Sequence, residues 1–300
     1  MLICSNSSER LKEKILGERK VFCKGLFLSA RWFVFSQTAD SGFHFIMMPD
    51  KESAEYCCAD LYNLIDGDKV FFLPESGKNV ERSNYKSSLA VQRTSAIEKI
   101  SGYSSGYLCI VSYPEAVNER IPSVSEIKES LLKFRVNENV NYESVTSSLL
   151  KNGFVKVDFV SSPGQFAVRG SIIDIFSYSH NYPFRISFFG NEIESIHTFD
   201  CNTQLSRTQE KEIEISRDLS SGTVETGIID ILPEDATIWL DSSDMYSGSD
   251  FYPELDRYRN VFIDTPLSET SVETVDFNIS PQPGFNKNFE IFTEDIRKKI

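Results

Sequence analysis

Residues 184–194 read Phe-Arg-Ile-Ser-Phe-Phe-Gly-Asn-Glu-Ile-Glu, two runs of alternating character on either side of a Gly-Asn pair. Gly190-Asn191 is typical of the two-residue turn of a β-hairpin, because glycine adopts positive φ at no steric cost. The register that follows contains two pairs: Phe189 with Glu192, and Ser187 with Glu194. The stretch therefore predicts an antiparallel hairpin.

The alternation of side chains assigns each residue of the hairpin to one of two faces. One face is wholly apolar, and we expect it to face the core: Phe184, Ile186, Phe188 and Ile193. The other face is polar apart from one aromatic ring: Arg185, Ser187, Phe189, Glu192 and Glu194. In residues 165–169 the same rule directs Phe166 and Val168 inward, and it directs outward Gln165, Ala167 and Arg169.

An exposed phenylalanine beside arginines has the composition of a protein-binding hot spot. Phe189 is the candidate, with Arg169 and Arg185 as its neighbours. The alternative is that a loop or a neighbouring domain covers Phe189 and that the arginines are only solvated. The exposure of Phe189 decides between these two interpretations.

Strand patterns surround the hairpin and predict a compact β-rich module over residues 121–206. The expected strands are 131–136, 155–160, 165–169, 171–176, 184–189 and 192–199. An amphipathic helix over residues 142–151 separates the first two of them.

Residues 1–120 alternate between strand and helix patterns, which predicts a parallel sheet with helices on its faces. The expected strands are 20–23, 43–48, 70–73 and 108–111, with a helix over 89–100 and a short helical turn opened by Pro114. Asp50 is the expected N-cap of a further helix that Gly67 ends. Its predicted apolar stripe consists of Ala54, Cys57, Cys58, Leu61, Leu64 and Ile65.

Residues 207–300 form an acidic third region, which we expect to continue the first domain. Strands are predicted at 237–240 and 261–263, and Glu210, Glu212 and Glu214 alternate on what we expect to be a solvated edge strand. Residues 286–300 carry apolar side chains at helical spacing. Because this stripe still runs at residue 300, we expect a fragment of a longer protein, with an ordinary C-terminal helix as the alternative.

The net charge is −13, and all of the excess lies in residues 141–300, which hold 26 Asp+Glu against 13 Lys+Arg. Without a basic cluster, such a chain repels the phosphate backbone, so we expect a protein or small-molecule partner rather than nucleic acid. No apolar run approaches the roughly 20 residues of a membrane span, and the N-terminus has no secretory signal. The six cysteines form no CxxC motif and no metal-ligand spacing with the three histidines. These features predict a reducing, cytoplasmic setting without membrane contact.

Two longer stretches carry a family resemblance. Residues 163–176 read Pro-Gly-Gln-Phe-Ala-Val-Arg-Gly-Ser-Ile-Ile-Asp-Ile-Phe, and residues 183–196 extend the hairpin, followed by Thr198-Phe199-Asp200 and Thr203-Gln204. They resemble signature segments of bacterial transcription-repair coupling factors (Mfd), and the excinuclease component UvrB has a related, shorter version. Weaker similarity at 20–36, 107–122 and 228–244, in the same order, extends the resemblance to the N-terminal UvrB-homology module of the family.

The resemblance implies an α/β domain, related to the P-loop domain of UvrB, with an inserted β-rich domain that binds the excinuclease component UvrA. The family's binding arginines correspond to Arg169 and Arg185, with Phe189 as the aromatic contact and Glu192 nearby. The implied function is recruitment of UvrA to stalled RNA polymerase. The resemblance also implies that other domains of the full-length protein bind polymerase and move along DNA with ATP, and that a C-terminal domain masks the UvrA-binding surface in the resting protein.

The nucleotide site of UvrB is a P-loop, which needs Gly-x4-Gly-Lys-[Ser/Thr] to cradle phosphates and hold Mg²⁺. The equivalent residues 25–32 keep only the first glycine, since Ala30, Arg31 and Trp32 replace the glycine, the lysine and the hydroxyl. They are more typical of the start of a buried helix. Residues 237–241 resemble the strand that ends in a metal-binding acid, but Ser242 replaces the glutamate that follows. This degenerate P-loop predicts no catalytic residue, no cofactor and no metal in the chain.

UvrB also carries a long aromatic hairpin that clamps damaged DNA. The corresponding link here, residues 74–88, has Tyr85 as its sole aromatic side chain and cannot supply a stacking platform. Two alternatives stay open: a UvrB-like, ATP-dependent DNA-damage enzyme, against which residues 25–32 argue, and a purely structural scaffold, which requires Phe189 to be buried.

Overall fold

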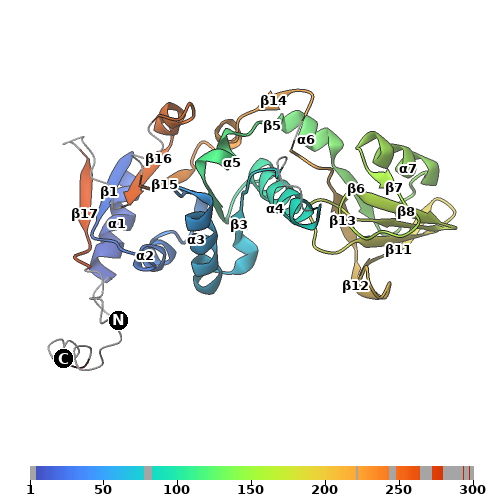
Figure 1. Cartoon of the computed structure of the whole chain (residues 1–300), viewed down its shortest axis with the longest axis horizontal. Coiled ribbons are helices and arrows are strands. Elements are labelled where there is room, and N and C mark those ends of the chain that lie inside the picture. Colours follow the sequence, from blue (N-terminus) through green and yellow to red (C-terminus); the bar gives the residue numbers. More distant parts are fainter. Residues whose placement is uncertain are drawn as a thin grey trace.

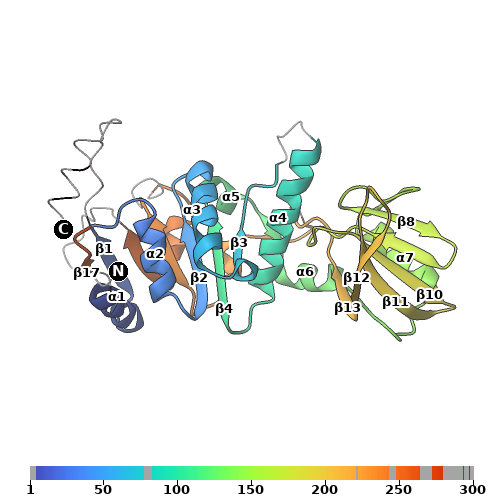
Figure 2. The ribbon, with the colours of Figure 1, turned by 90° about the horizontal axis from the view of Figure 1, so that it is seen from below.

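The computed structural model describes residues 5–77, 83–220, 222–242, 248–263, 272–279, 293 and 297 of the 300-residue chain. It is elongated, with an α/β part at one end and a β-rich part at the other (Figure 1). Helix α4 (Ser83–Ser101) lies between the two parts in both views (Figure 2). No helix in these described ranges is long and apolar enough to span a membrane.

The α/β part is built on a seven-stranded sheet in which every strand pair is parallel. Its strands are β1 (Lys20–Lys24), β2 (Gly42–Met47), β3 (Val70–Phe72), β4 (Tyr107–Ser112), β15 (Thr237–Asp241), β16 (Arg259–Ile263) and β17 (Glu273–Asp276). The strand order is β17-β1-β16-β15-β2-β4-β3, so strands from the last third of the chain lie between β1 and β2. The predicted α/β class with a parallel sheet is confirmed.

Helices cover both faces of this sheet, which explains why its strands are continuously apolar. One core contains side chains of α1 (Ser5–Gly17), α2 (Ala30–Thr38) and α3 (Lys51–Leu64). The other contains side chains of α4 and α6 (Val124–Ser130), together with short 3₁₀ turns. The short helix opened by Pro114 is α5 (Pro114–Asn118). The remaining turns are η1 (Gly67–Lys69), η2 (Ile229–Ile231) and η4 (Tyr252–Arg257).

Helix α3 begins where the sequence predicts and ends earlier. Asp50 caps it, and Oδ1 of Asp50 accepts a hydrogen bond from the Ser53 amide at 2.8 Å. The predicted end at Gly67 is wrong, because Ile65 already adopts extended backbone and Gly67 opens η1. Ala54, Cys57, Cys58 and Leu61 of the predicted stripe are buried, whereas Leu64 is exposed.

The β-rich part is a six-stranded sheet of order β12-β11-β10-β9-β8-β7. Its strands are β7 (Val155–Lys156), β8 (Gln165–Arg169), β9 (Ile172–Ile175), β10 (Phe184–Phe189), β11 (Glu192–Phe199) and β12 (Ser206–Glu210). Helix α7 (Tyr142–Lys151) and the pair β6 (Leu132–Arg135) and β13 (Glu212–Ile215) pack on one face and close an apolar core. A second short pair joins β5 (Ile121–Pro122) and β14 (Glu225–Thr226). The predicted strand 155–160 is wrong beyond Lys156.

The hairpin β10–β11 agrees with the predicted faces and departs from the predicted register. Gly190 has φ of 62°, as the turn requires, and Phe189 pairs with Glu192. Ser187 pairs with Ser195 rather than Glu194, because a β-bulge follows Ser187 and adds one residue to β11. The predicted inward residues Phe184, Ile186, Phe188 and Ile193 are all buried.

Two expectations are left without a structural outcome. The predicted helix over 286–300 lies outside the described residues, apart from Thr293 and Arg297. The domain limits 1–120, 121–206 and 207–300 stay predictions.

Candidate functional site

The face of the β-rich sheet opposite α7 brings the four predicted partner-binding residues together. Cross-strand pairing sets Ala167, Asp174, Arg185 and His197 in one row. The next row holds Arg169, Ile172, Ser187 and Ser195, and Phe189 with Glu192 forms the row at the tip. Paired residues share a face of the sheet, so Arg169, Arg185, Phe189 and Glu192 lie on one surface, which we call the outer face.

Phe189 projects from the outer face and is 80% exposed. Its neighbour Phe188 points to the opposite side and is 4% exposed. The predicted exposure of Phe189 is confirmed. The alternatives in which a loop covers Phe189, or in which it is buried inside a scaffold domain, are wrong for the described chain.

A buried carboxylate, Asp174, joins the two arginines of the outer face. Its Oδ1 accepts from Nε of Arg185 at 2.8 Å, and its Oδ2 accepts from Nη2 of Arg185 at 3.0 Å. Nη2 of Arg169 also donates to Oδ2. Asp174 is 1% exposed, and a carboxylate buried to that degree is stable only when it is paired. Sequence reasoning missed Asp174, which interrupts the apolar run of β9.

Arg185 is largely enclosed by its partners and is 17% exposed. Its Nη1 donates to the Gln204 carbonyl at 3.1 Å and its Nη2 to Oε1 of Gln204 at 3.4 Å. The guanidinium carbon lies 4.4 Å from the ring centroid of Phe199. The hydrogen bond to Asp174 raises the pKa of Arg185, so the guanidinium stays charged.

Arg169 is more accessible, with 36% of its side chain exposed. Its guanidinium lies 5.3 Å from the ring centroid of Phe159, an exposed side chain that precedes β8. Ala167, which was also predicted to face solvent, is buried. That prediction was wrong because Val160, Phe176 and Phe199 cover the end of the outer face that lies away from Phe189.

Comparison with known proteins shows which family the chain resembles. The family described as the UvrB interaction domain matches residues 132–218. The transcription-repair-coupling factor of Bacillus subtilis (strain 168) is 29% identical over 206 residues, which are 68% of this chain and 17% of that protein. The chain is related to the transcription-repair coupling factors. A relative from Staphylococcus aureus (strain bovine RF122 / ET3-1) is 26% identical over 206 residues, again 68% of this chain and 17% of that protein. A relative from Borreliella burgdorferi is 33% identical over 91 residues, which are 30% of this chain and 8% of that protein.

The chain therefore spans about a sixth of the length of these coupling factors, whereas the similarity covers about two thirds of the chain. The family match includes the whole outer face, since β8, β9, β10 and β11 all lie within residues 132–218. It also includes β6 and β13, which close the core beneath that sheet. The surface that carries Arg169, Arg185, Phe189 and Glu192 thus belongs to the part of the chain that matches this family.

The two motifs that would form a nucleotide site lie side by side in the α/β part and are joined by an ion pair. Nη1 of Arg31, at the start of α2, lies 2.5 Å from Oδ2 of Asp241, at the end of β15. Nε of Arg31 also donates to the Leu28 carbonyl at 2.9 Å. Gly25 has φ of +75°, and a Cβ there would lie 3.2 Å from the backbone nitrogen of Asn278. Local packing therefore accounts for the surviving glycine, and Arg31 neutralises the acid that a metal would need.

The predicted buried helix is present but begins at Ala30, so that Phe27 and Leu28 are exposed before it. Trp32 and Phe35 are buried in the core, as expected. No cluster of His, Cys, Asp or Glu suited to a metal occurs in the described ranges.

The histidines and cysteines have environments that suit packing. His44 is buried, Trp239 Nε1 donates to its Nδ1 at 3.2 Å, and burial lowers its pKa to about 4. Burial raises the pKa of Cys58 to about 12, far from the range of a reactive thiolate. The five cysteines that the structure describes are free thiols: Cys23, Cys57, Cys58, Cys109 and Cys201.

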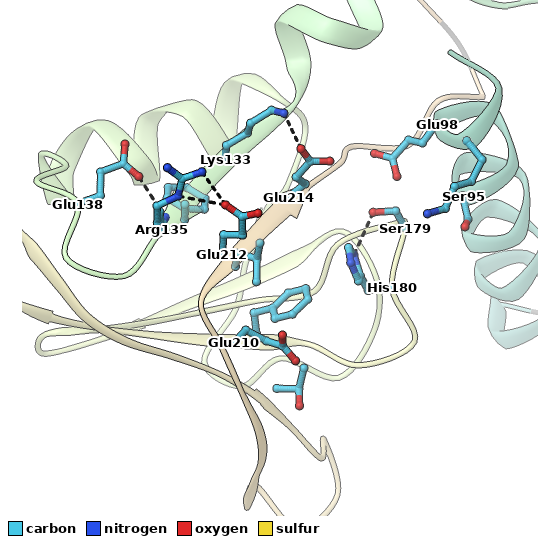
Figure 3. A pocket seen from close by; sticks show the side chains of 15 residues that line it. Ser95, Glu98, Lys133, Arg135, Glu138, Ser179, His180, Glu210, Glu212 and Glu214 are labelled. Carbon is cyan, nitrogen blue, oxygen red and sulfur yellow. Dashed lines mark hydrogen bonds and ion pairs between the residues drawn. The ribbon is translucent and has the colours of Figure 1, made fainter. Parts of the chain in front are cut away.

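A hollow of about 880 Å³ separates α4 from the β-rich part (Figure 3). Two ion pairs between β6 and β13 line it, Lys133 with Glu214 at 2.5 Å and Arg135 with Glu212 at 2.6 Å. From α4, Glu98 reaches toward Ser179, and burial raises its pKa to about 7. The acids predicted on one solvated edge strand thus belong to two strands, and Glu212 and Glu214 are exposed but paired.

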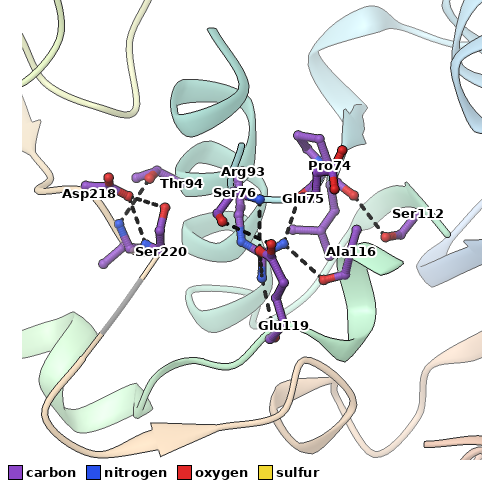
Figure 4. A network of polar contacts seen from close by, with 12 residues as sticks. Pro74, Glu75, Ser76, Arg93, Thr94, Ser112, Ala116, Glu119, Asp218 and Ser220 are labelled. Carbon is purple, nitrogen blue, oxygen red and sulfur yellow. Dashed lines mark hydrogen bonds and ion pairs between the residues drawn. The ribbon is translucent and has the colours of Figure 1, made fainter. Parts of the chain in front are cut away.

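The link that follows β3 is tied down at its start by a buried arginine (Figure 4). Nη1 of Arg93 donates to the carbonyls of Pro74 at 2.7 Å and Ala116 at 3.0 Å. Glu119 accepts from the Ser76 amide at 2.8 Å and from the Ser76 hydroxyl at 3.0 Å. These contacts hold residues 74–76 against the end of α5. The side chain of Tyr85 lies outside the described residues.

Proposed function

We propose that this chain is a non-catalytic recruitment module that binds the excinuclease component UvrA through the outer face of its β-rich domain. In the full-length protein, this contact brings the excision machinery to a stalled RNA polymerase. The observation that carries the proposal is Phe189, 80% exposed on the same surface as the Asp174-linked arginines. The match to the UvrB interaction domain and the names of the relatives support it.

The chemistry of the outer face suits a protein partner. Removal of a phenylalanine ring from water on binding contributes about 1.5–3 kcal/mol, and an adjacent arginine adds a charge-assisted hydrogen bond. Glu192 lies directly opposite Phe189 and supplies an acidic neighbour at the rim. Aromatic and arginine side chains are the two types that dominate interface hot spots.

The absence of catalysis is proposed from the nucleotide-site remnant. A P-loop binds phosphate with backbone amides and a free lysine, whereas Arg31 is paired with both Asp241 and the Leu28 carbonyl. The alternative, a UvrB-like ATP-dependent enzyme, would require this ion pair to open and Mg²⁺ to displace the guanidinium. We propose that binding of RNA polymerase and ATP-driven movement on DNA belong to other parts of the full-length protein, since the chain matches only 17% of the Bacillus subtilis relative.

The remaining properties are proposed from charge and thiol chemistry. A net charge of −13 disfavours tight binding of duplex DNA. Free thiols at the five described cysteines support a reducing, cytoplasmic location.

A capture experiment with purified components tests the proposed function. The chain is immobilised, purified UvrA is passed over it, and retention is measured at about 0.15 M salt. We expect saturable retention of UvrA and none of a control protein of similar charge. No retention of UvrA at micromolar concentration would contradict the proposal.

A further inference from the structure

We infer that the two arginines of the outer face have different tasks: Arg169 forms the ionic contact with a carboxylate of the partner, and Asp174 and Arg185 position it. The inference rests on the proposed function and deepens it, since it names the chemistry of the contact. A family resemblance alone assigns both arginines to binding and cannot separate them.

Arg185 has little capacity left for a partner. Four of its hydrogen-bonding interactions are internal: two with the carboxylate of Asp174 and two with Gln204. A guanidinium has five N–H groups, so these contacts leave at most one of them unengaged. With the ring of Phe199 against one side and 17% exposure, Arg185 joins the loop before β12 to the centre of the sheet.

Arg169, in contrast, has N–H groups left to bind a partner. Among the described residues its guanidinium donates to Asp174 alone, through Nη2. Its remaining N–H groups lie on a side chain that is 36% exposed, next to the exposed ring of Phe159. A guanidinium held at one nitrogen, with the rest of its fork accessible, is arranged to bind a second carboxylate.

The charge of the cluster indicates which ligand it attracts. Two guanidinium groups share one carboxylate, so Arg169, Arg185 and Asp174 together carry a charge of +1. Asp174 contacts both guanidinium groups, but Arg169 is 36% exposed and Arg185 only 17%, so the net positive charge is accessible to a partner mainly at Arg169. The occupant that fits is a protein surface with an acidic side chain beside an apolar pocket for Phe189.

Asp174 acts on the partner only through Arg169, since it is 1% exposed and cannot be touched. It lies on β9 and reaches both β8 and β10, so its carboxylate fixes where the Arg169 guanidinium sits relative to Phe189. A side chain anchored before binding loses less conformational entropy when the complex forms. Asp174 is therefore a positioning residue.

The test compares UvrA affinity and thermal melting for Arg169→Ala, Arg185→Lys and Asp174→Asn in the whole chain. We expect Arg169→Ala to weaken binding about tenfold, to leave the melting temperature within about 2 °C, and to reduce the salt dependence of the dissociation constant. Arg185→Lys keeps the positive charge but cannot form the two parallel hydrogen bonds to Asp174. It should therefore lower the melting temperature and weaken binding by less than about threefold.

A double-mutant cycle tests positioning. Asp174→Asn should weaken binding several-fold in the wild-type chain and less than about twofold in the Arg169→Ala background. Equal effects in both backgrounds would overturn the positioning role. If Asp174→Asn fails to fold, the comparison of Arg169→Ala with Arg185→Lys decides, because equal losses of affinity at unchanged melting would overturn the division of tasks.

Phe189→Ala separates the failure of this inference from the failure of the proposed function. Loss of UvrA binding with Phe189→Ala but not with Arg169→Ala would refute the role of Arg169 and leave the proposed function intact. Unchanged binding in both variants would refute the outer face as the UvrA site. If duplex DNA rather than UvrA showed the tenfold dependence on Arg169, the ligand would be a phosphate, and the inferred carboxylate would be wrong.

Discussion

Phe188 and Phe189 are consecutive residues of β10 on opposite faces of the sheet, so truncating each to alanine should have very different effects on stability. Phe188 is 4% exposed, packs among the apolar residues of the core and meets the ring of Tyr142 edge-on at 5.2 Å. Phe188→Ala should lower the free energy of unfolding by about 3–5 kcal/mol, the cost of the lost burial plus the cavity. Phe189→Ala removes a ring that is already in water and should change it by less than about 0.5 kcal/mol.

Urea unfolding of the two variants, followed by circular dichroism, measures this difference. The slope of the free energy against urea concentration should be unchanged, so that the midpoints report stability alone. Phe188→Leu is the matched control, and its smaller volume change should cost less than Phe188→Ala. A cost above about 1.5 kcal/mol for Phe189→Ala, or below about 1 kcal/mol for Phe188→Ala, would refute the assignment of faces.

Three further predictions concern the rest of the chain. A fluorescent ATP analogue with Mg²⁺ should show no saturable micromolar binding, because Arg31 and Asp241 neutralise each other where phosphate and metal would lie; binding abolished by changes in the Gly25 loop would contradict this. Burial raises the pKa of Glu98 from 4.5 to about 7, so the folded state holds this proton more tightly and loses stability as the pH rises through that window. Glu98→Gln should therefore raise the free energy of unfolding more at pH 8 than at pH 5, by at most about 3 kcal/mol. An equal gain at both pH values would rule out ionisation of Glu98 as the cause. In a gel shift at physiological salt, the chain should bind duplex DNA far more weakly than nanomolar, and a nanomolar complex would overturn the argument from net charge.

The outer face could be predicted in part because strand alternation is a local property. It separates Phe188 from Phe189 without any knowledge of neighbouring strands. The role of Asp174 could not be predicted in this way, because its partners lie on strands β8 and β10 and depend on the register between strands. The bulge after Ser187 was also invisible, since a two-residue turn fixes only the pairs nearest to it.

In the α/β part, the positions of the strands could be predicted from the sequence but their order in the sheet could not. Apolar runs bounded by polar residues locate its strands, but their order depends on long-range pairing. Nothing in the local sequence places β15 and β16 between β1 and β2. Glycine as the stop signal places the end of α3 too late, because the extended backbone of Ile65 already ends the helix.

The affinity of UvrA for Phe189→Ala decides whether the outer face is the UvrA-binding surface. Leu150→Ala is the matched control, because Leu150 is also an exposed apolar side chain but lies on α7, which packs on the other face of the sheet. The dissociation constants of the wild-type chain and both variants are measured by titration with purified UvrA at one salt concentration. We expect Phe189→Ala to weaken binding at least thirtyfold, about 2 kcal/mol, and Leu150→Ala to bind like the wild type. Wild-type affinity for a folded Phe189→Ala variant would contradict this assignment.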